Sequence, residues 1–495
     1  MNAPAQPGLP PLSLKDPKLF RNQCYVDGAW TGAPGGASYA VTNPASGATL
    51  ATVPDLGAAE ARRAIEAANA AWTVWRAMTA KERGAIMRKW FDLILANQED
   101  LAQILTAEQG KPLAEARGEI AYGASFIEWY AEEGKRVYGD VIPQHQVDKR
   151  LLVIKQPVGV TAAITPWNFP IAMVTRKVAP ALAAGCTVVL KPAEQTPLSA
   201  LALAELADRA GFPKGVLNII TTNDPVAVGG ELTSNPLVRK ITFTGSTEVG
   251  RILMRQAADQ IKKVSFELGG NAPLIVFDDA DLDAAVEGAI ASKYRNAGQT
   301  CVCANRIYVQ DGIYDAFAKK IAEKVGAFKV GPGTENGVMI GPLIDEQGLQ
   351  KVEAHVKDAL AKGAKALTGG KRHELGGLFF QPTVLAGVTG DMRLAGEETF
   401  GPVAPLFRFK TEEEAVRLAN ASEFGLAAYF FSRDVGRVFR VSEALEAGIV
   451  SVNTGLFSQE VAPFGGVKQS GIGREGSKYG IEPFLEIKFI CIGGV

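Results

Sequence analysis

The sequence predicts an α/β fold with two doubly wound parallel-sheet domains, and three observations lead to that prediction. Across residues 56–133 the apolar side chains recur at spacings of three and four, as they do from Ile86 to Ile94, which is typical of amphipathic helices. From about residue 151, short β-rich runs alternate with helical stretches rich in Ala and Leu, and a second alternating block begins near Leu274. Such alternation indicates parallel strands joined by helices that cover both faces of a sheet.

The predicted strands are short apolar runs bounded by Gly and Pro. In the first block they lie at residues 159–165, 187–190, 216–220 and 238–243. In the second block they lie at residues 274–277, 306–309, 403–409, 427–431 and 449–452. Thr411 followed by Glu414 predicts a capping box that opens a helix.

Two further segments, 151–156 and 485–492, are predicted to be extended. The second is apolar on both faces and lies at a chain end, where an uncovered strand edge would promote aggregation. We therefore expect it to pair, either within the chain or with a partner subunit.

Composition excludes several classes of protein. The 495 residues are 47% hydrophobic and carry a net charge of −1 with both signs mixed, which argues against a nucleic-acid or membrane-surface protein. No apolar run is long enough to span a bilayer, and the first residues do not have the pattern of a signal peptide. The five cysteines are then expected to be reduced thiols in the cytoplasm, and three scattered histidines indicate no metal site.

Cys301 is the strongest candidate for a reactive side chain. Its neighbours Gly298, Gln299 and Thr300 are polar and turn-like, so a substrate could approach the sulfur. Glu267, in a Phe-Glu-Leu-Gly-Gly run, could act as a general base with a pKa raised by burial. The alternatives stay open that Cys301 is a structural thiol and Glu267 an ion-pair partner.

Loops after three successive predicted strands carry further candidates. Asn168, after the first strand, could donate its amide N–H to a developing oxyanion, or could simply stabilise the loop. Lys191 and Glu194, after the second, could bind ribose hydroxyls, or form a solvated turn. Gly245 and Ser246 follow the third strand and open a helix, which suits a phosphate. Together the three loops favour a nucleotide site.

With these motifs assembled, the chain resembles the aldehyde dehydrogenase superfamily over nearly its whole length. The matching motifs are Pro-Trp-Asn-Phe-Pro, Lys-Pro-Ala-Glu, Phe-Thr-Gly-Ser, Glu-Leu-Gly-Gly, Gly-Gln-Thr-Cys, Glu-Glu-Thr-Phe-Gly-Pro and Pro-Phe-Gly-Gly-Val-Lys, in that order. The resemblance implies a Rossmann-like coenzyme domain (1–133 and 151–267), a catalytic domain (268–470) and a small β oligomerisation arm (134–150 and 484–495). It also implies a homo-oligomer, either a dimer or a tetramer.

The resemblance also assigns roles to individual residues. Cys301 would be the nucleophile, Glu267 the base and Asn168 part of the oxyanion hole. The cofactor would be held by Trp167, Lys191, Glu194, Gly245, Ser246, Glu398 and Phe400. We expect NAD, because a carboxylate at Glu194 would repel the 2′-phosphate of NADP, although NADP remains possible.

Within the superfamily the sequence is most similar to succinate-semialdehyde dehydrogenases, through Cys-Val-Cys-Ala-Asn-Arg and the run from Gly473 to Glu482. Arg176, Arg295 and Ser458 look like that subfamily's binders of the distal carboxylate. Arg295 is expected about 9 Å along a helix from Cys301, within reach of a short diacid. Ordinary salt bridges are the alternative for both arginines.

The expected reaction is therefore oxidation of succinate semialdehyde to succinate through a Cys301 thiohemiacetal and thioester. Glutarate semialdehyde and 2-oxoglutarate semialdehyde are alternative substrates, and a cysteine thioesterase or hydrolase without nucleotide is the alternative from another class. Cys303, two residues from Cys301, could form a strained and easily reduced disulfide with it, or could be a packing residue.

Overall fold

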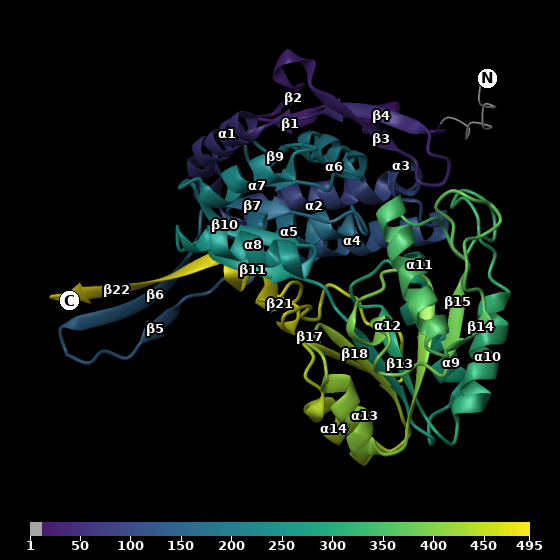
Figure 1. Cartoon of the computed structure of the whole chain (residues 1–495). Helices are drawn as coiled ribbons and strands as arrows, with labels where there is room; N and C mark the ends of the chain where they lie inside the picture. The colour runs from purple at the N-terminus through teal and green to yellow at the C-terminus, as the bar shows by residue number, and fades with distance from the viewer. Residues whose placement is uncertain (1–11) are drawn as a thin grey trace, which may run out of the picture.

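The computed structural model describes residues 12–495, which are arranged around two large sheets (Figure 1). The first sheet has eight strands in the order β2-β1-β9-β8-β7-β10-β11-β21. Its strands are β1 (Cys24–Val26), β2 (Ala29–Thr31), β7 (Val160–Ile164), β8 (Thr187–Lys191), β9 (Leu217–Ile219), β10 (Val238–Thr244), β11 (Lys263–Glu267) and β21 (Gly471–Ile472). The central five strands are parallel, whereas β1, β2 and β21 are antiparallel additions at the edges.

The helices from α1 to α8 surround this sheet (Figure 1). They are α1 (Ala58–Ala77), α2 (Ala80–Ala96), α3 (Gln98–Gln109), α4 (Leu113–Glu133), α5 (Ala172–Ala184), α6 (Pro197–Ala210), α7 (Pro225–Ser234) and α8 (Thr247–Ala258). The start of α2 is fixed by a capping box, in which the Glu82 backbone N–H donates to the Thr79 hydroxyl and the Thr79 N–H donates to the Glu82 carboxylate. Several helices end where a glycine takes a left-handed conformation, as Gly185 does after α5 with φ of 98°.

The second sheet has seven strands in the order β14-β15-β16-β13-β12-β18-β19. These are β12 (Ala272–Val276), β13 (Ala304–Gln310), β14 (Lys365–Thr368), β15 (Thr383–Ala386), β16 (Val403–Phe409), β18 (Ala427–Phe431) and β19 (Ile449–Val452). The helices of this layer are α9 (Leu282–Tyr294), α10 (Tyr314–Gly326), α11 (Glu346–Ala361), α12 (Arg393–Gly396), α13 (Glu412–Asn420) and α14 (Val435–Ala444). Two small ribbons complete the body, β3 (Ser38–Thr42) with β4 (Thr49–Pro54), and β17 (Phe424–Gly425) with β20 (Val467–Lys468).

The prediction of two parallel-sheet α/β units is confirmed. The predicted strands at 403–409, 427–431 and 449–452 have the bounds of β16, β18 and β19, and the others agree to within two residues at each end. The predicted capping box at α13 is only half formed: the Glu414 N–H donates to the Thr411 hydroxyl, but the Glu414 carboxylate accepts from the Lys410 N–H instead of Thr411.

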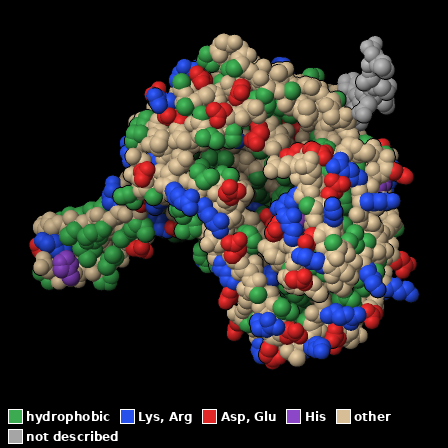
Figure 2. Space-filling model, viewed as in Figure 1, with side chains coloured by type: hydrophobic (Ala, Val, Ile, Leu, Met, Phe, Trp, Pro, Cys, Tyr) green, Lys and Arg blue, Asp and Glu red, His purple; other side chains and the backbone are tan. Residues whose placement is uncertain are grey.

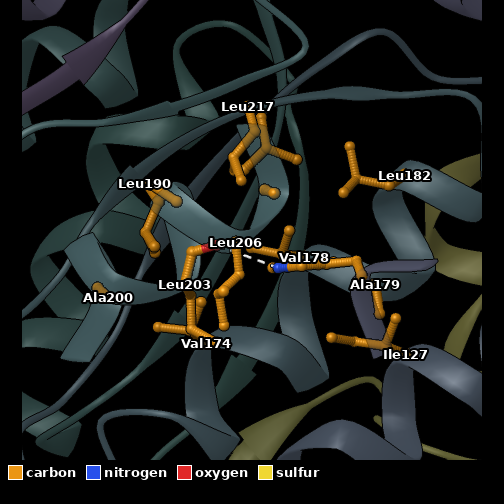
Figure 3. Close-up of a cluster of buried hydrophobic side chains, with 14 of the residues drawn as sticks. Ile127, Val174, Val178, Ala179, Leu182, Leu190, Ala200, Leu203, Leu206 and Leu217 are labelled. Carbon is orange, nitrogen blue, oxygen red and sulfur yellow. Dashed lines mark hydrogen bonds between the residues drawn. The ribbon is translucent and has the colours of Figure 1, made fainter. Parts of the chain in front are cut away.

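The core of the first unit lies where α5 and α6 face the sheet. Figure 3 shows aliphatic side chains from α5, α6, β8 and β9 directed toward one another. The labelled members that are fully shielded from solvent include Val178, Leu182, Leu190, Leu203 and Leu206. Close packing of this kind holds the carboxyl ends of the parallel strands in fixed positions, which matters for the loops that follow them.

A three-stranded arm projects from the body (Figure 1). It consists of β5 (Asp140–Ile142), β6 (Lys149–Pro157) and β22 (Leu485–Gly493), and β22 pairs antiparallel with β6 along its full length. The C-terminal strand therefore pairs within the chain, one of the two outcomes that we expected. Several side chains of β22 are still exposed, among them Ile487 and Phe489. Figure 2 shows hydrophobic side chains gathered on the arm.

Candidate active site

Seven of the predicted site residues line a cavity of about 360 Å³ between the two sheets. Its lining includes Trp167, Asn168, Gly245, Ser246, Cys301, Glu398 and Phe400. The carboxyl ends of the parallel strands β7, β10 and β11 supply one wall, and the second unit supplies the other. A larger cavity of about 520 Å³, lined by Leu12, Phe20 and Gly333 among others, holds none of the predicted residues.

Cys301 lies half-buried in the cavity wall, in the loop before β13. Burial raises the pKa of its thiol to about 12, the charge of Glu398 raises it further, and Arg176 opposes the rise. The sulfur is approachable, as expected, but it rests as a neutral thiol. Attack on a substrate therefore requires a proton acceptor or additional positive charge nearby.

The turn before Cys301 differs from the prediction. Helix α9 ends at Tyr294, and the following 3₁₀ turn Arg295–Gly298 contains left-handed residues, with φ of 52° at Asn296 and 55° at Ala297. The prediction that a helix runs from Arg295 to Cys301 is therefore wrong. At Gly298, φ is 76° and a Cβ atom would lie 2.1 Å from the Gly401 carbonyl oxygen, so only glycine fits this close approach.

Asn168 is buried in the loop that follows β7. Its Nδ2 donates a hydrogen bond to the Gln299 carbonyl oxygen at 3.1 Å, which ties the loop to the Cys301 segment. An amide nitrogen carries two hydrogens, so one N–H remains for a ligand. The geometry is compatible with the oxyanion role that we expected.

Glu267 ends β11 and is buried beside the cavity, one residue before the lining residue Leu268. Burial and the nearby charge of Glu475 raise the pKa of Glu267 well above its usual range, while Arg176, Lys177 and Arg474 oppose the rise. The raised pKa agrees with the expectation for a base. The side chain itself faces the backbone of Gly465, where a Cβ atom would lie 2.9 Å from its Oε1.

Arg176 is not a surface residue. It is 2% exposed on α5, its Nη2 lies 2.9 Å from Oε2 of Glu475, and its guanidinium lies 3.9 Å from the ring centre of Phe464. Lys177 also pairs with Glu475. Sequence reasoning missed both Lys177 and Glu475, because no local pattern indicates a contact across nearly 300 residues of chain.

Arg295 and Ser458 line a small pocket together with Val302, the residue after Cys301. The Arg295 guanidinium lies 5.2 Å from the ring centre of Phe169, which neighbours Asn168. Within residues 12–495, Arg295 has no ion-pair partner. Of the two predicted arginines, it is the one whose charge is not already matched by a carboxylate.

The predicted cofactor residues fall into two groups. Lys191 and Glu194 lie outside the cavity lining, with Lys191 Nζ 3.4 Å from Glu194 Oε2. The Ser246 hydroxyl accepts from the Val249 N–H and so caps α8, and Ser246 itself lines the cavity, so the N-terminus of this helix lies at the cavity wall.

Glu398 and Phe400 form the opposite side of the cavity. Glu398 Oε1 accepts from the Gly270 N–H at 3.3 Å, and burial raises the pKa of Glu398 to about 7. Phe400 has φ of 57°, and its ring meets Trp167 edge to face at 5.5 Å. Helix α11 adds Gln347 and Lys351 to the lining, two polar residues that no motif singled out.

Cys303 is buried away from this lining, and its thiol donates to the Lys293 carbonyl oxygen at 3.4 Å. All five cysteines are free thiols. Among residues 12–495 no group of three or more His, Cys, Asp or Glu side chains is arranged to hold a metal ion, and no helix there is long and apolar enough to cross a membrane.

A half-buried cysteine, a buried carboxyl group of raised pKa and a cavity at the carboxyl ends of parallel strands are features of a dinucleotide-dependent oxidoreductase. The sequence model of the Aldehyde dehydrogenase family matches residues 30–490. The chain belongs to the aldehyde dehydrogenase family, whose members oxidise aldehydes with NAD or NADP as electron acceptor.

Several relatives match over almost their entire length. The chain is 66% identical to a succinate-semialdehyde dehydrogenase [NADP(+)] of Escherichia coli, over 97% of this chain and 100% of that protein. It is 65% identical to a glutarate-semialdehyde dehydrogenase of Pseudomonas aeruginosa, over 98% of this chain and 100% of that protein. The solved structure of a succinate-semialdehyde dehydrogenase from Burkholderia pseudomallei superimposes with a TM-score of 0.96 at 66% identity, covering 97% and 100% of the two chains.

Proposed function

We propose that this enzyme oxidises succinate semialdehyde to succinate, with Cys301 as the nucleophile. The observation that carries the substrate proposal is Arg295, which forms no ion pair with any other residue of 12–495 and lies in the pocket beside the Cys301 loop. A guanidinium presents a planar pair of donors that suits a carboxylate at the far end of a short chain. Relatives whose names specify succinate and glutarate semialdehydes support a substrate of this kind.

In the proposed reaction the Cys301 thiol loses its proton to solvent, the thiolate adds to the aldehyde carbon, and the resulting oxyanion is stabilised by the free N–H of Asn168. The positive charge of Arg176 favours the thiolate. A bound nicotinamide would supply the hydride acceptor, so that loss of hydride from the carbon attached to Cys301 would leave a thioester on that residue. Glu267, once ionised, removes a proton from water, and the hydroxide releases the acid from the thioester; the departing Cys301 thiolate then recovers the proton from Glu267.

The residues present fit a dinucleotide. The N-terminus of α8 suits the pyrophosphate, Glu398 can accept hydrogen bonds from ribose hydroxyls, and the rings of Phe400 and Trp167 form an apolar wall. We infer that NAD is preferred over NADP, because Glu194 would repel a 2′-phosphate. The name of the Escherichia coli relative specifies NADP(+), so the cofactor preference of this enzyme needs to be measured directly.

Glutarate semialdehyde and 2-oxoglutarate semialdehyde remain candidate substrates, because one carbon more or less changes the reach to Arg295 only slightly. The arm supports a homo-oligomer, a dimer or tetramer, since its outer strand exposes Ile487 and Phe489 at 71% and 59%. Five unpaired thiols support a reducing compartment such as the cytoplasm.

The test is a panel of semialdehydes of three to six carbons, each assayed with NAD and with NADP by absorbance of the reduced cofactor. The highest kcat/KM is expected for succinate semialdehyde with NAD. Cys301→Ala should abolish turnover while still binding the reduced cofactor. An alanine variant that turns over at the native rate would refute the proposed mechanism.

A further inference from the structure

Three charged side chains lie at or just before the start of α4, and none of them lines the cavity. They are Lys111, Glu115 and Glu119. Lys111 and Glu119 form an ion pair of 2.5 Å between Nζ and Oε2, and their side chains are 0% and 1% exposed. Charges are rarely buried this deeply without a specific role, because removing each from water is costly.

The buried pair holds the Asn168 loop at both ends. Lys111 Nζ donates to the Asn168 carbonyl oxygen at 2.8 Å and lies 3.8 Å from the ring centre of Phe169. The other carboxylate oxygen of Glu119 accepts from the backbone N–H groups of Ile171 and Ala172 at 2.9 and 3.2 Å. These are the first N–H groups of α5, so the carboxylate also caps that helix.

The third charge holds the segment that leads to Cys301. Glu115 accepts from the backbone N–H of Asn296 at 2.7 Å, within the left-handed turn. The Asn296 side chain in turn donates to the carbonyl oxygens of Asn168 and Gln299, at 2.9 and 3.2 Å. A left-handed non-glycine turn persists only where its surroundings over-determine it, and these hydrogen bonds supply that constraint.

We propose that Lys111, Glu115 and Glu119 form a positioning cluster that sets the Asn168 amide against the Cys301 segment. None of the three residues lines the cavity, so we expect them to act through the Asn168 loop and not by contact with substrate or cofactor. It acts by fixing both sides of the proposed oxyanion site before the reaction begins, so that little reorganisation is needed when negative charge develops. This inference rests on the proposed roles of Asn168 and Cys301.

A purely structural role for the cluster would make a different prediction. An ion pair that only joined α4 to α5 would affect catalysis independently of the Asn168 amide. A positioning role acts through that amide, so its effect should disappear when the amide is absent. A double-mutant cycle between Glu119 and Asn168 separates the two.

The experiment compares Glu119→Gln, Asn168→Ala and the double variant in the full-length enzyme, assayed with succinate semialdehyde. A misplacement near 1 Å can lower the rate about 100-fold, so Glu119→Gln should lower kcat by about that factor while the Kd for reduced cofactor stays unchanged. In the Asn168→Ala background the same substitution should lower kcat by less than about threefold. If the two substitutions instead lower kcat by factors that simply multiply in the double variant, the cluster proposal is overturned. The proposed roles of Asn168 and Cys301 would not be affected by that result.

The matched control is Glu99→Gln, which breaks the exposed ion pair between Glu99 of α3 and Arg117 of α4 and should leave kcat unchanged. Glu115→Gln provides a second route if Glu119→Gln folds poorly, and it should show the same dependence on Asn168. An Asn168→Ala variant with native kcat would overturn both the cluster and the proposed oxyanion site.

Discussion

The imidazole of His355 bridges the two residues on either side of Glu398. Its Nε2 lies 3.0 Å from Oε2 of Glu397, and its Nδ1 lies 3.1 Å from the Thr399 hydroxyl. Burial lowers the pKa of His355, so the neutral ring has one donor nitrogen and one acceptor nitrogen for these two partners. The histidine therefore ties α11 to the segment that carries Glu398 and Phe400.

Replacing His355 with alanine should release that segment. A buried hydrogen bond is worth about 1 kcal/mol, so loss of the two should weaken binding of the reduced cofactor about tenfold or more. A fluorescence titration with the reduced cofactor measures the change. His145→Ala, on the exposed arm, is the control and should bind as the native enzyme does. Equal affinity in all three proteins would show that His355 does not support the cofactor site.

Cofactor binding should depend on pH through Glu398. Its pKa of about 7 means that the carboxylate becomes protonated as the pH falls through 7, and it then loses an acceptor for the ribose hydroxyls. The Kd for reduced cofactor should rise as the pH falls from 8 to about 5.5. Glu398→Gln should bind more weakly at pH 8 and show a flat profile. A native profile in this variant would assign the titration to another group.

The two arginines near the cavity should respond differently to substitution. Arg295→Ala should lower kcat/KM for succinate semialdehyde roughly 10–150-fold, because a charge-assisted hydrogen bond is worth about 1.5–3 kcal/mol. Its activity on propanal should survive.

Arg176→Ala should also destabilise the fold, because breaking a buried ion pair costs about 3–5 kcal/mol. Denaturant titration and assays on both aldehydes provide the comparison. Equal losses on succinate semialdehyde and propanal in Arg295→Ala would make that residue structural.

Glu194→Ser should shift the cofactor preference toward NADP. The substitution removes the negative charge that would repel a 2′-phosphate, and it frees Lys191, now 3.4 Å from Glu194, to meet that phosphate. The measurement is the ratio of kcat/KM for NAD and NADP. An unchanged ratio would contradict the role of Glu194 in discrimination.

The buried Lys240 should make stability depend on pH. Burial lowers its pKa to about 7, below the usual value near 10.5, although its Nζ donates to the Ser265 hydroxyl at 2.6 Å. Between these pH values the unfolded chain binds more protons than the native one, so the free energy of unfolding should rise with pH by up to about 1.4 kcal/mol per unit. Lys240→Met should flatten that slope between pH 7 and 10, whereas the exposed Lys89→Met should not. Denaturant titrations at several pH values measure it.

Local sequence patterns predicted most of the parallel strands of the two large sheets and the loops at their carboxyl ends, because apolar periodicity and turn residues act over a few positions. They did not predict β11, which carries Glu267, since Lys263 and Ser265 interrupt its apolar pattern. They also failed after Arg295, where Asn296 donates hydrogen bonds to the distant Glu115 carboxylate and Asn168 carbonyl oxygen in a turn that is not helical. The ion pairs of Glu475 arise from tertiary packing, about which neighbouring residues carry no information.

Glu267 comes from the eight-stranded sheet, whereas Cys301 precedes a strand of the seven-stranded sheet. Their relative position thus depends on how the two layers sit against each other, and each layer has its own apolar core. Mild denaturant is expected to loosen the contact between the two layers before it unfolds either layer. Turnover would then decay at concentrations where circular dichroism still reports full helicity, so catalysis is a more sensitive gauge of interlayer alignment than any spectroscopic measure of folded content.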